Sequence, residues 1–153
     1  MIDAGDTAPD FTLESTTGQP VTLSNQLGIG PVVLYFYPHD FTPVCTAQAC
    51  MVRDRHADVL AAGYRIFGIS AQGLGSHGKF IRRHALPFTL LADPDKRVAR
   101  GYGVAGPLAL FPRRATFVIN QDGTVRERVV SDFRVAPHRD LLERLADLGP
   151  PVS

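Results

Sequence analysis

The amino-acid sequence predicts an α/β fold, a three-layer sandwich in which helices cover both faces of a central mixed sheet. Its length of 153 residues fits one domain, residues 1–153, with a single core. A continuous apolar, β-branched and aromatic run at residues 31–37 is typical of a strand buried on both faces. Behind that run, helical and strand-like patterns alternate, as they do in α/β proteins.

The first elements are an N-terminal hairpin and the buried strand. Short alternating runs at residues 11–14 and 21–23 flank a segment that contains Gly and Pro where a turn needs them. We therefore expect a hairpin extension ahead of the main sheet. The buried run follows and is ended by Pro38, so it is expected to be a central strand.

A long helix comes next. The spacing of apolar residues is helical from Thr42 to about residue 62, and Gly63 follows as a natural stop. Thr42 is a candidate N-cap, because its hydroxyl can accept a hydrogen bond from a free backbone N–H. Pro43 then falls at the favoured first helical position.

The second half of the chain continues the alternation and closes with a hairpin and a helix. The residues 121–123, Gln-Asp-Gly, carry a strong hairpin signal between two strand-like runs. Parallel strands with crossing helices, followed by an antiparallel hairpin, describe a thioredoxin-like sandwich. The expected elements are strands at 64–70, 88–92, 115–120 and 124–132, and helices at 76–84, 93–100 and 137–148.

Composition excludes several classes of function. Sixteen basic and fifteen acidic residues give a net charge of +1, too small for a general nucleic-acid surface. No apolar run approaches the roughly 18 residues of a membrane span, and no export signal is visible. We therefore expect a cytoplasmic protein with no nucleic-acid or membrane partner. The five histidines are scattered, and we expect them at surface or boundary positions.

The chemistry is expected at the two cysteines, Cys45 and Cys50, which are too few for a disulfide-stapled scaffold. Cys45 falls in the first turn of the long helix, where free N–H groups and the helix dipole favour a thiolate. In an intact helix the two Cα atoms lie about 8 to 9 Å apart. A disulfide needs roughly 4.4 to 6.8 Å. Either Cys50 is inert packing, or the start of the helix unwinds.

The spacing Pro38-x-x-x-Thr42-x-x-Cys45 resembles the active-site signature of the peroxiredoxins. With Cys50 five residues later, the chain resembles the Q-type, bacterioferritin-comigratory-protein-like thiol peroxidases. The resemblance runs almost end to end, with similar segments at residues 5–13, 91–96, 102–104 and 114–120. Two departures are Val44, where these proteins usually have Gly, and a loop at residues 105–112 that looks short.

The resemblance implies a role for each of five residues. Cys45 attacks the peroxide and becomes a sulfenic acid, and Cys50 resolves it as an intramolecular disulfide. Thr42 orients the peroxide, and Pro38 covers the sulfur. Arg114 stabilises the thiolate and the leaving oxygen, since the spacing Arg-x-Thr-Phe favours it over its neighbour Arg113.

The partners implied are a hydroperoxide substrate and thioredoxin as reductant, with no cofactor and no metal ion. A resolving cysteine in the same chain makes no demand for a second subunit, so a monomer is expected. Two other functions share the expected fold. One is a protein thiol–disulfide oxidoreductase, and the other is a redox sensor that reports oxidation without turnover.

Overall fold

The computed structural model describes residues 1–106 and 112–148 and has a seven-stranded mixed sheet in the order β2-β1-β5-β4-β3-β6-β7. The thioredoxin-like α/β sandwich predicted from the sequence is confirmed. The strands are β1 (Thr12–Ser15), β2 (Val21–Thr22), β3 (Val32–Phe36), β4 (Arg65–Ser70), β5 (Thr89–Ala92), β6 (Ala115–Ile119) and β7 (Val125–Val130). The helices are α1 (Leu23–Leu27), α2 (Pro43–Ala61), α3 (Leu74–His84), α4 (Arg97–Gly101) and α5 (Ala136–Leu148).

The strand β3 lies in the interior of the sheet, and all five of its residues are buried. It runs parallel to β4 on one side and antiparallel to β6 on the other. Its side chains alternate between the faces: Val33 and Tyr35 enter one hydrophobic cluster, while Leu34 and Phe36 enter the other. A strand that supplies two cores has no polar face, which explains the continuous apolar run in its sequence.

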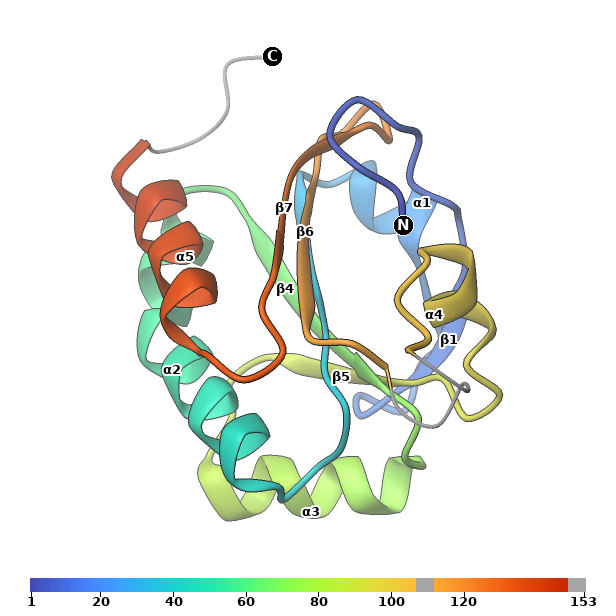
Figure 1. Ribbon diagram of the computed structural model, residues 1–153, viewed down its shortest axis with the longest axis vertical. Coiled ribbons are helices and arrows are strands. Elements are labelled where there is room, and N and C mark those ends of the chain that lie inside the picture. The colour runs from blue at the N-terminus through green and yellow to red at the C-terminus, as the bar shows by residue number, and fades with distance from the viewer. Residues whose placement is uncertain (107–111, 149–153) are drawn as a thin grey trace.

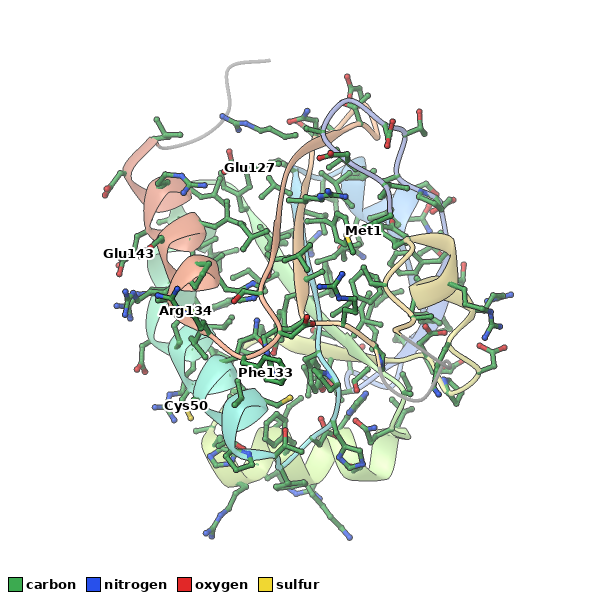
Figure 2. All side chains as sticks on the ribbon, in the orientation of Figure 1. Met1, Cys50, Glu127, Phe133, Arg134 and Glu143 are labelled. Carbon is green, nitrogen blue, oxygen red and sulfur yellow. The ribbon has the colours of Figure 1, made fainter. Side chains whose placement is uncertain are left out.

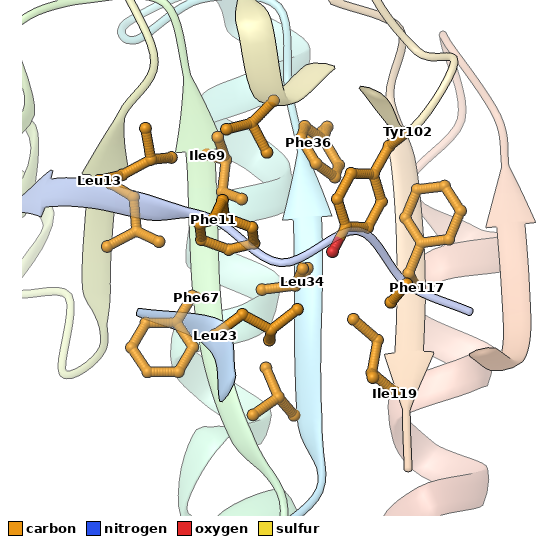
Figure 3. Close-up of a cluster of buried hydrophobic side chains, with 14 of the residues drawn as sticks. Phe11, Leu13, Leu23, Leu34, Phe36, Phe67, Ile69, Tyr102, Phe117 and Ile119 are labelled. Atoms are coloured by element: carbon orange, nitrogen blue, oxygen red, sulfur yellow. The ribbon is translucent and has the colours of Figure 1, made fainter. Parts of the chain in front are cut away.

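Helices cover the two faces of the sheet. In Figure 1, α2 and α5 lie side by side over one face, α1 and α4 lie over the other, and α3 crosses below the start of α2. The cluster under α1 and α4 is rich in rings, with Phe36, Tyr102 and Phe117 stacked edge to face or tilted at 5.2 to 5.9 Å (Figure 3). The sheet thus divides the predicted single core into two halves.

The observed elements differ from the predicted ones mainly at their ends. The helix α1 was not predicted, because one turn is too short to display a helical period. The helix α3 begins two residues earlier than expected, with Gly73 at its N-cap. The strand β7 ends at Val130 rather than at Asp132, and this difference places Asp132 in the functional site described below.

The sheet determines the position of that site through its register. Phe36 at the end of β3 pairs with Ala115 at the start of antiparallel β6, and Ala115 pairs with Val130 at the end of β7. The segments that follow β3 and β7, and the residues just before β6, therefore meet at one edge of the sheet. The parallel strands β3, β4 and β5 also end there, and this carboxyl edge is where α/β proteins place ligands.

The strand β4 has no room for a side chain at Gly68. A Cβ added there would lie 2.7 Å from Leu90 Cδ2 and 2.8 Å from Tyr35 Cζ. We predict that Gly68→Ala lowers the free energy of unfolding by about 1 to 3 kcal/mol through overpacking. Urea denaturation measures the effect. The matched control is Gly75→Ala in α3, where nothing lies within 4 Å of the added Cβ, so no loss is expected.

Candidate active site

The site begins in the loop that joins β3 to α2. Thr42 is the N-cap residue by position and Pro43 is the first helical residue, as predicted. Cys45 follows in the first turn of α2 and is 2% exposed. The helix is regular from the start, since the backbone N–H of Thr46 donates to the Thr42 carbonyl at 2.8 Å. The Cys45 sulfur thus lies where the positive end of the helix dipole favours an anion.

The loop before the helix is held by its own hydrogen bonds. The Thr42 hydroxyl donates to the His39 carbonyl at 3.1 Å and makes no cap bond, so the predicted capping through this side chain is not found. Phe41 has a φ of +66°, an uncommon conformation for a residue with a side chain. Pro38 is partly buried and its carbonyl accepts a bond from the Ser70 hydroxyl at 3.3 Å.

Arg114 lies beside Cys45. Its Nη2 is 3.1 Å from the Cys45 Sγ, and its side chain is buried just before β6 begins. Arg113, the alternative considered from the sequence, points away and pairs with Asp132 at 2.9 Å with a side chain that is 41% exposed. Adjacent residues of an extended segment face opposite sides, and here it is Arg114 that faces the sulfur.

Three acceptors fix the guanidinium of Arg114. Its Nη1 donates to the Gln48 Oε1 at 2.5 Å, its Nε donates to the Asp132 carbonyl at 3.0 Å, and its Nη2 meets the sulfur. The Asp132 carboxylate also accepts from the backbone N–H of Arg114 and from the Arg113 side chain. The hydrogen bond from Arg113 holds the pKa of Asp132 below its ordinary range. The cation at the sulfur is therefore immobilised in advance.

Gln48 and Asp132 did not emerge from the sequence. A signal existed for Gln48, because residues three apart share a face of a helix and Gln48 follows Cys45 at that spacing. Nothing local marks Asp132. It reaches the site only because β7 pairs with β6 and the chain then turns back toward Arg114.

A buried polar cluster anchors the loop from the other side. The Asp40 carboxylate accepts bonds from the Tyr37 hydroxyl at 2.6 Å, the Ser76 hydroxyl at 2.8 Å and His77 Nδ1 at 2.6 Å. His77 Nε2 lies 3.0 Å from the carbonyl of Leu91, so both ring nitrogens have a polar partner. The cluster ties the loop after β3 to helix α3.

The expectation that the histidines lie at surface or boundary positions is wrong for two of them. His77 and His138 are 0% and 1% exposed. Each occupies a polar niche in the core, His138 between the Thr116 hydroxyl at 2.8 Å and the Ser131 carbonyl at 3.0 Å. Burial lowers the pKa of His138 and favours its neutral ring. Isolated histidines in a sequence give no sign of such partners.

Cys50 is half-buried and lies on the same uninterrupted helix as Cys45. Both thiols are free, and Figure 2 places Cys50 on the early turns of α2. On an intact helix the two Cα atoms lie about 8 to 9 Å apart, so a bond between the two sulfurs requires the helix start to unwind. The Cys50 Sγ lies 3.9 Å from Nδ1 of His84 at the end of α3.

Within 1–106 and 112–148, no group of three His, Cys, Asp or Glu side chains is placed to hold a metal ion. None of the helices in the same ranges is both long enough and apolar enough to cross a membrane. Most of the 105–112 loop, which looks short beside the peroxiredoxins that the sequence resembles, lies outside the described residues.

A cysteine at a helix start, with an immobilised guanidinium on its sulfur and a thioredoxin-like sheet beneath, is the arrangement of a thiol peroxidase. The sequence profile of the AhpC/TSA family matches residues 4–128, and the chain belongs to this family, on its peroxiredoxin Q branch. The resemblance noted in the sequence is thereby confirmed.

Individual relatives agree with this assignment. The chain is 41% identical over 140 residues to the chloroplastic peroxiredoxin Q of Sedum lineare, covering 91% of this chain and 75% of that protein. The Arabidopsis thaliana protein of the same name is also 41% identical over 140 residues, which cover 91% of this chain and 64% of that protein.

Solved structures give the same result. The peroxidoxin BcpB of Mycobacterium tuberculosis has a TM-score of 0.88 at 35% identity, covering 97% of this chain and 98% of that one. Peroxiredoxin Q of Xanthomonas campestris has a TM-score of 0.80 at 28% identity and 90% coverage of both chains.

The cluster around Asp40 leads to a prediction about stability and pH. Burial raises the pKa of this carboxyl, but the hydrogen bonds from His77 and Tyr37 outweigh burial and hold the pKa below its usual value. A depressed carboxyl pKa contributes stability above about pH 4 that is lost as the pH falls through the folded-state pKa. Asp40→Asn should therefore cost about 3 kcal/mol at pH 7, because it leaves His77 buried without its partner.

Urea denaturation at several pH values tests this prediction. The difference between wild type and Asp40→Asn should shrink below about pH 4, as the Asp40 carboxyl of the folded wild type takes up a proton. The control is Asp58→Asn on the exposed face of α2, which should change little. A loss for Asp40→Asn that does not vary with pH would mean that the ion pair is not its source.

Proposed function

We propose that the chain reduces hydroperoxides through Cys45. The thiolate attacks one peroxide oxygen, the O–O bond breaks, and water or an alcohol leaves after taking up a proton. Cys45 is left as a sulfenic acid, so the sulfur is oxidised by two electrons and the peroxide is reduced by two. The observation that carries the proposal is the Arg114 Nη2 at 3.1 Å from the Cys45 Sγ.

Arg114 acts on both sides of the reaction. Its charge stabilises the anionic sulfur before attack, and it lies next to the oxygen that becomes negative as the O–O bond breaks. Because Gln48 and Asp132 already fix the guanidinium, little reorganisation is needed when charge moves. Thr42 offers a hydroxyl to orient the peroxide, and Pro38 shields the sulfur from water.

Cys50 completes the cycle as the resolving cysteine. Its thiolate attacks the sulfenic sulfur, the S–O bond breaks, water is released, and an intrachain Cys45–Cys50 disulfide forms. The half-buried position of Cys50, on the same helix and away from Cys45, is compatible with this step only after local unwinding. Thioredoxin then supplies the two electrons that regenerate both thiols.

The cellular setting is part of the proposal. Both cysteines work within one chain, so a monomer suffices. A pair of free thiols is suited to a reducing compartment, and we place the protein in the cytoplasm, although the plant relatives carry the description chloroplastic.

Turnover separates this function from its rivals. With thioredoxin, its reductase and hydrogen peroxide, the wild type should consume many equivalents of peroxide per chain, and Cys45→Ser should consume none. A protein thiol–disulfide oxidoreductase would reduce a disulfide substrate without consuming peroxide. A redox sensor would stop after a single equivalent.

The two neighbouring arginines allow a matched test of the site. Arg114→Ala should slow oxidation of Cys45 by at least about a hundredfold, because it removes the fixed donor at the sulfur. Arg113→Ala removes only an exposed ion pair and should stay within about fivefold of wild type. Rapid quenching in alkylating reagent, followed by intact mass measurement, gives both rates. The reverse ranking would contradict the proposed role of Arg114.

The distance between the cysteines leads to a prediction about structure. Oxidation of the wild type should produce an intrachain Cys45–Cys50 bond, lower the far-UV helix signal and speed amide exchange at the start of α2. Cys50→Ser should keep the fast first oxidation, lack the helix change and over-oxidise readily at Cys45. Disulfide-linked dimers, or a lasting sulfenic acid with Cys50 free in the wild type, would rule out the intrachain step.

A further inference from the structure

The described residues place a histidine against the second cysteine. His84 is the last residue of α3, and its Nδ1 lies 3.9 Å from the Cys50 Sγ, within hydrogen-bonding range for sulfur. Neither the attack of Cys45 on peroxide nor the bonds around Arg114 use this contact. A thiol attacks only as its thiolate, so Cys50 needs an acceptor for its proton. Histidine is the side chain best suited to that task near neutral pH.

The position of His84 is fixed by packing. Its ring lies 5.2 Å from the Phe80 ring in an edge-to-face contact and 6.5 Å from the Phe41 ring. Its carbonyl accepts a bond from the Arg53 Nη1 at 2.9 Å, which ties the end of α3 to α2 one turn beyond Cys50. The rings of Phe41 and Phe80 therefore hold the imidazole, and Arg53 ties the backbone of His84 to α2.

Charged side chains of both helices are close in sequence to the pair. On α2, Arg53 pairs with Asp54 at 3.1 Å, and on α3 the last turn carries Arg82 and Arg83 next to His84. The rings of Phe41 and Phe80 supply the apolar side.

The two cysteines are also held with different strength. Cys45 is held by Arg114, and that charge-assisted contact weakens once the sulfur becomes an uncharged sulfenic acid. The contacts of Cys50 and Arg53 with His84 do not involve the oxidised group. If the first turn of α2 unwinds after oxidation, Cys45 can approach a Cys50 that keeps its contact with His84.

We propose that His84 is the general base of the resolving step. Its Nδ1 takes the proton of the Cys50 thiol, and the resulting thiolate attacks the sulfenic sulfur of Cys45. The S–S bond forms, the S–O bond breaks, and the imidazolium returns the proton to the departing hydroxide, which leaves as water. No external oxidant or reductant enters the step. The inference rests on the proposed function, in which Cys50 resolves Cys45.

The test separates the two chemical steps in time. Reduced protein is mixed with one equivalent of hydrogen peroxide, quenched in alkylating reagent and analysed by intact mass, so that thiols, sulfenic acid and disulfide are counted. His84→Phe keeps a ring between Phe41 and Phe80 but has no proton acceptor. The matched control is His56→Phe, a half-buried α2 histidine that packs on Phe88 at 6.1 Å.

At pH 7, His84→Phe should form the sulfenic acid at the wild-type rate and the disulfide at least about tenfold more slowly. At about pH 9.5, above the ordinary range of a thiol, the disulfide rates should converge because Cys50 no longer needs a base. His84→Gln, which keeps a polar side chain but accepts no proton as a base, should behave alike. His56→Phe should match the wild type in both steps.

Three results would overturn the proposal. A disulfide formed at the wild-type rate by His84→Phe and His84→Gln at pH 7 would mean that His84 only packs. Slowing by the same factor at both pH values would mean that the histidine acts through structure alone. If the wild type itself forms no Cys45–Cys50 disulfide, the resolving step of the proposed function fails, and the role of His84 fails with it.

Discussion

The contact between Arg114 and Cys45 is the interaction on which the rest of the site depends. A buried guanidinium is costly unless its donors are matched, and here they are matched by Gln48, Asp132 and the sulfur itself. The acceptors come from two separate parts of the chain: the sulfur and Gln48 from α2, and Asp132 from the segment after β7. The pairing of β3, β6 and β7 is therefore needed for the site, because it brings the sulfur, Gln48 and Asp132 to Arg114.

The segment that runs from the end of β3 to Cys45 in the first turn of α2 is supported from two directions. Arg114 holds its helical end, and the buried Asp40–His77 pair holds its middle against α3. Thr42 and Phe41 lie between these supports. Phe41 has a positive φ, and its ring packs on Phe80 at 5.0 Å. The first turn of α2 is thus ordered by tertiary contacts more than by its own cap.

The sequence predicted most of the fold because the elements have strong local signals. The apolar run of β3, the Gln-Asp-Gly turn and the long period of α2 all appeared with the expected type. The site was predictable as far as its motif reached, to Cys45, Thr42, Pro38 and Arg114. Gln48 could have been found from helix spacing. Asp132, the Asp40–His77 pair and the contact of His84 with Cys50 could not, since each joins residues from different elements that only the folded chain brings together.

The two-faced burial of β3 has a consequence for changes in chain length. A deletion of one residue within the strand would exchange the side chains between the two cores and draw the following loop back by about 3.3 Å. Cys45 would then lose its contact with Arg114, although all the reacting residues would still be present in the sequence. The turn between β1 and β2, at residues 16–20, does not connect a central strand to the site. Insertions there therefore leave the register of the central strands unchanged. Across natural variation, the chain from β3 to Cys45 should therefore be nearly constant in length, while this turn is free to grow.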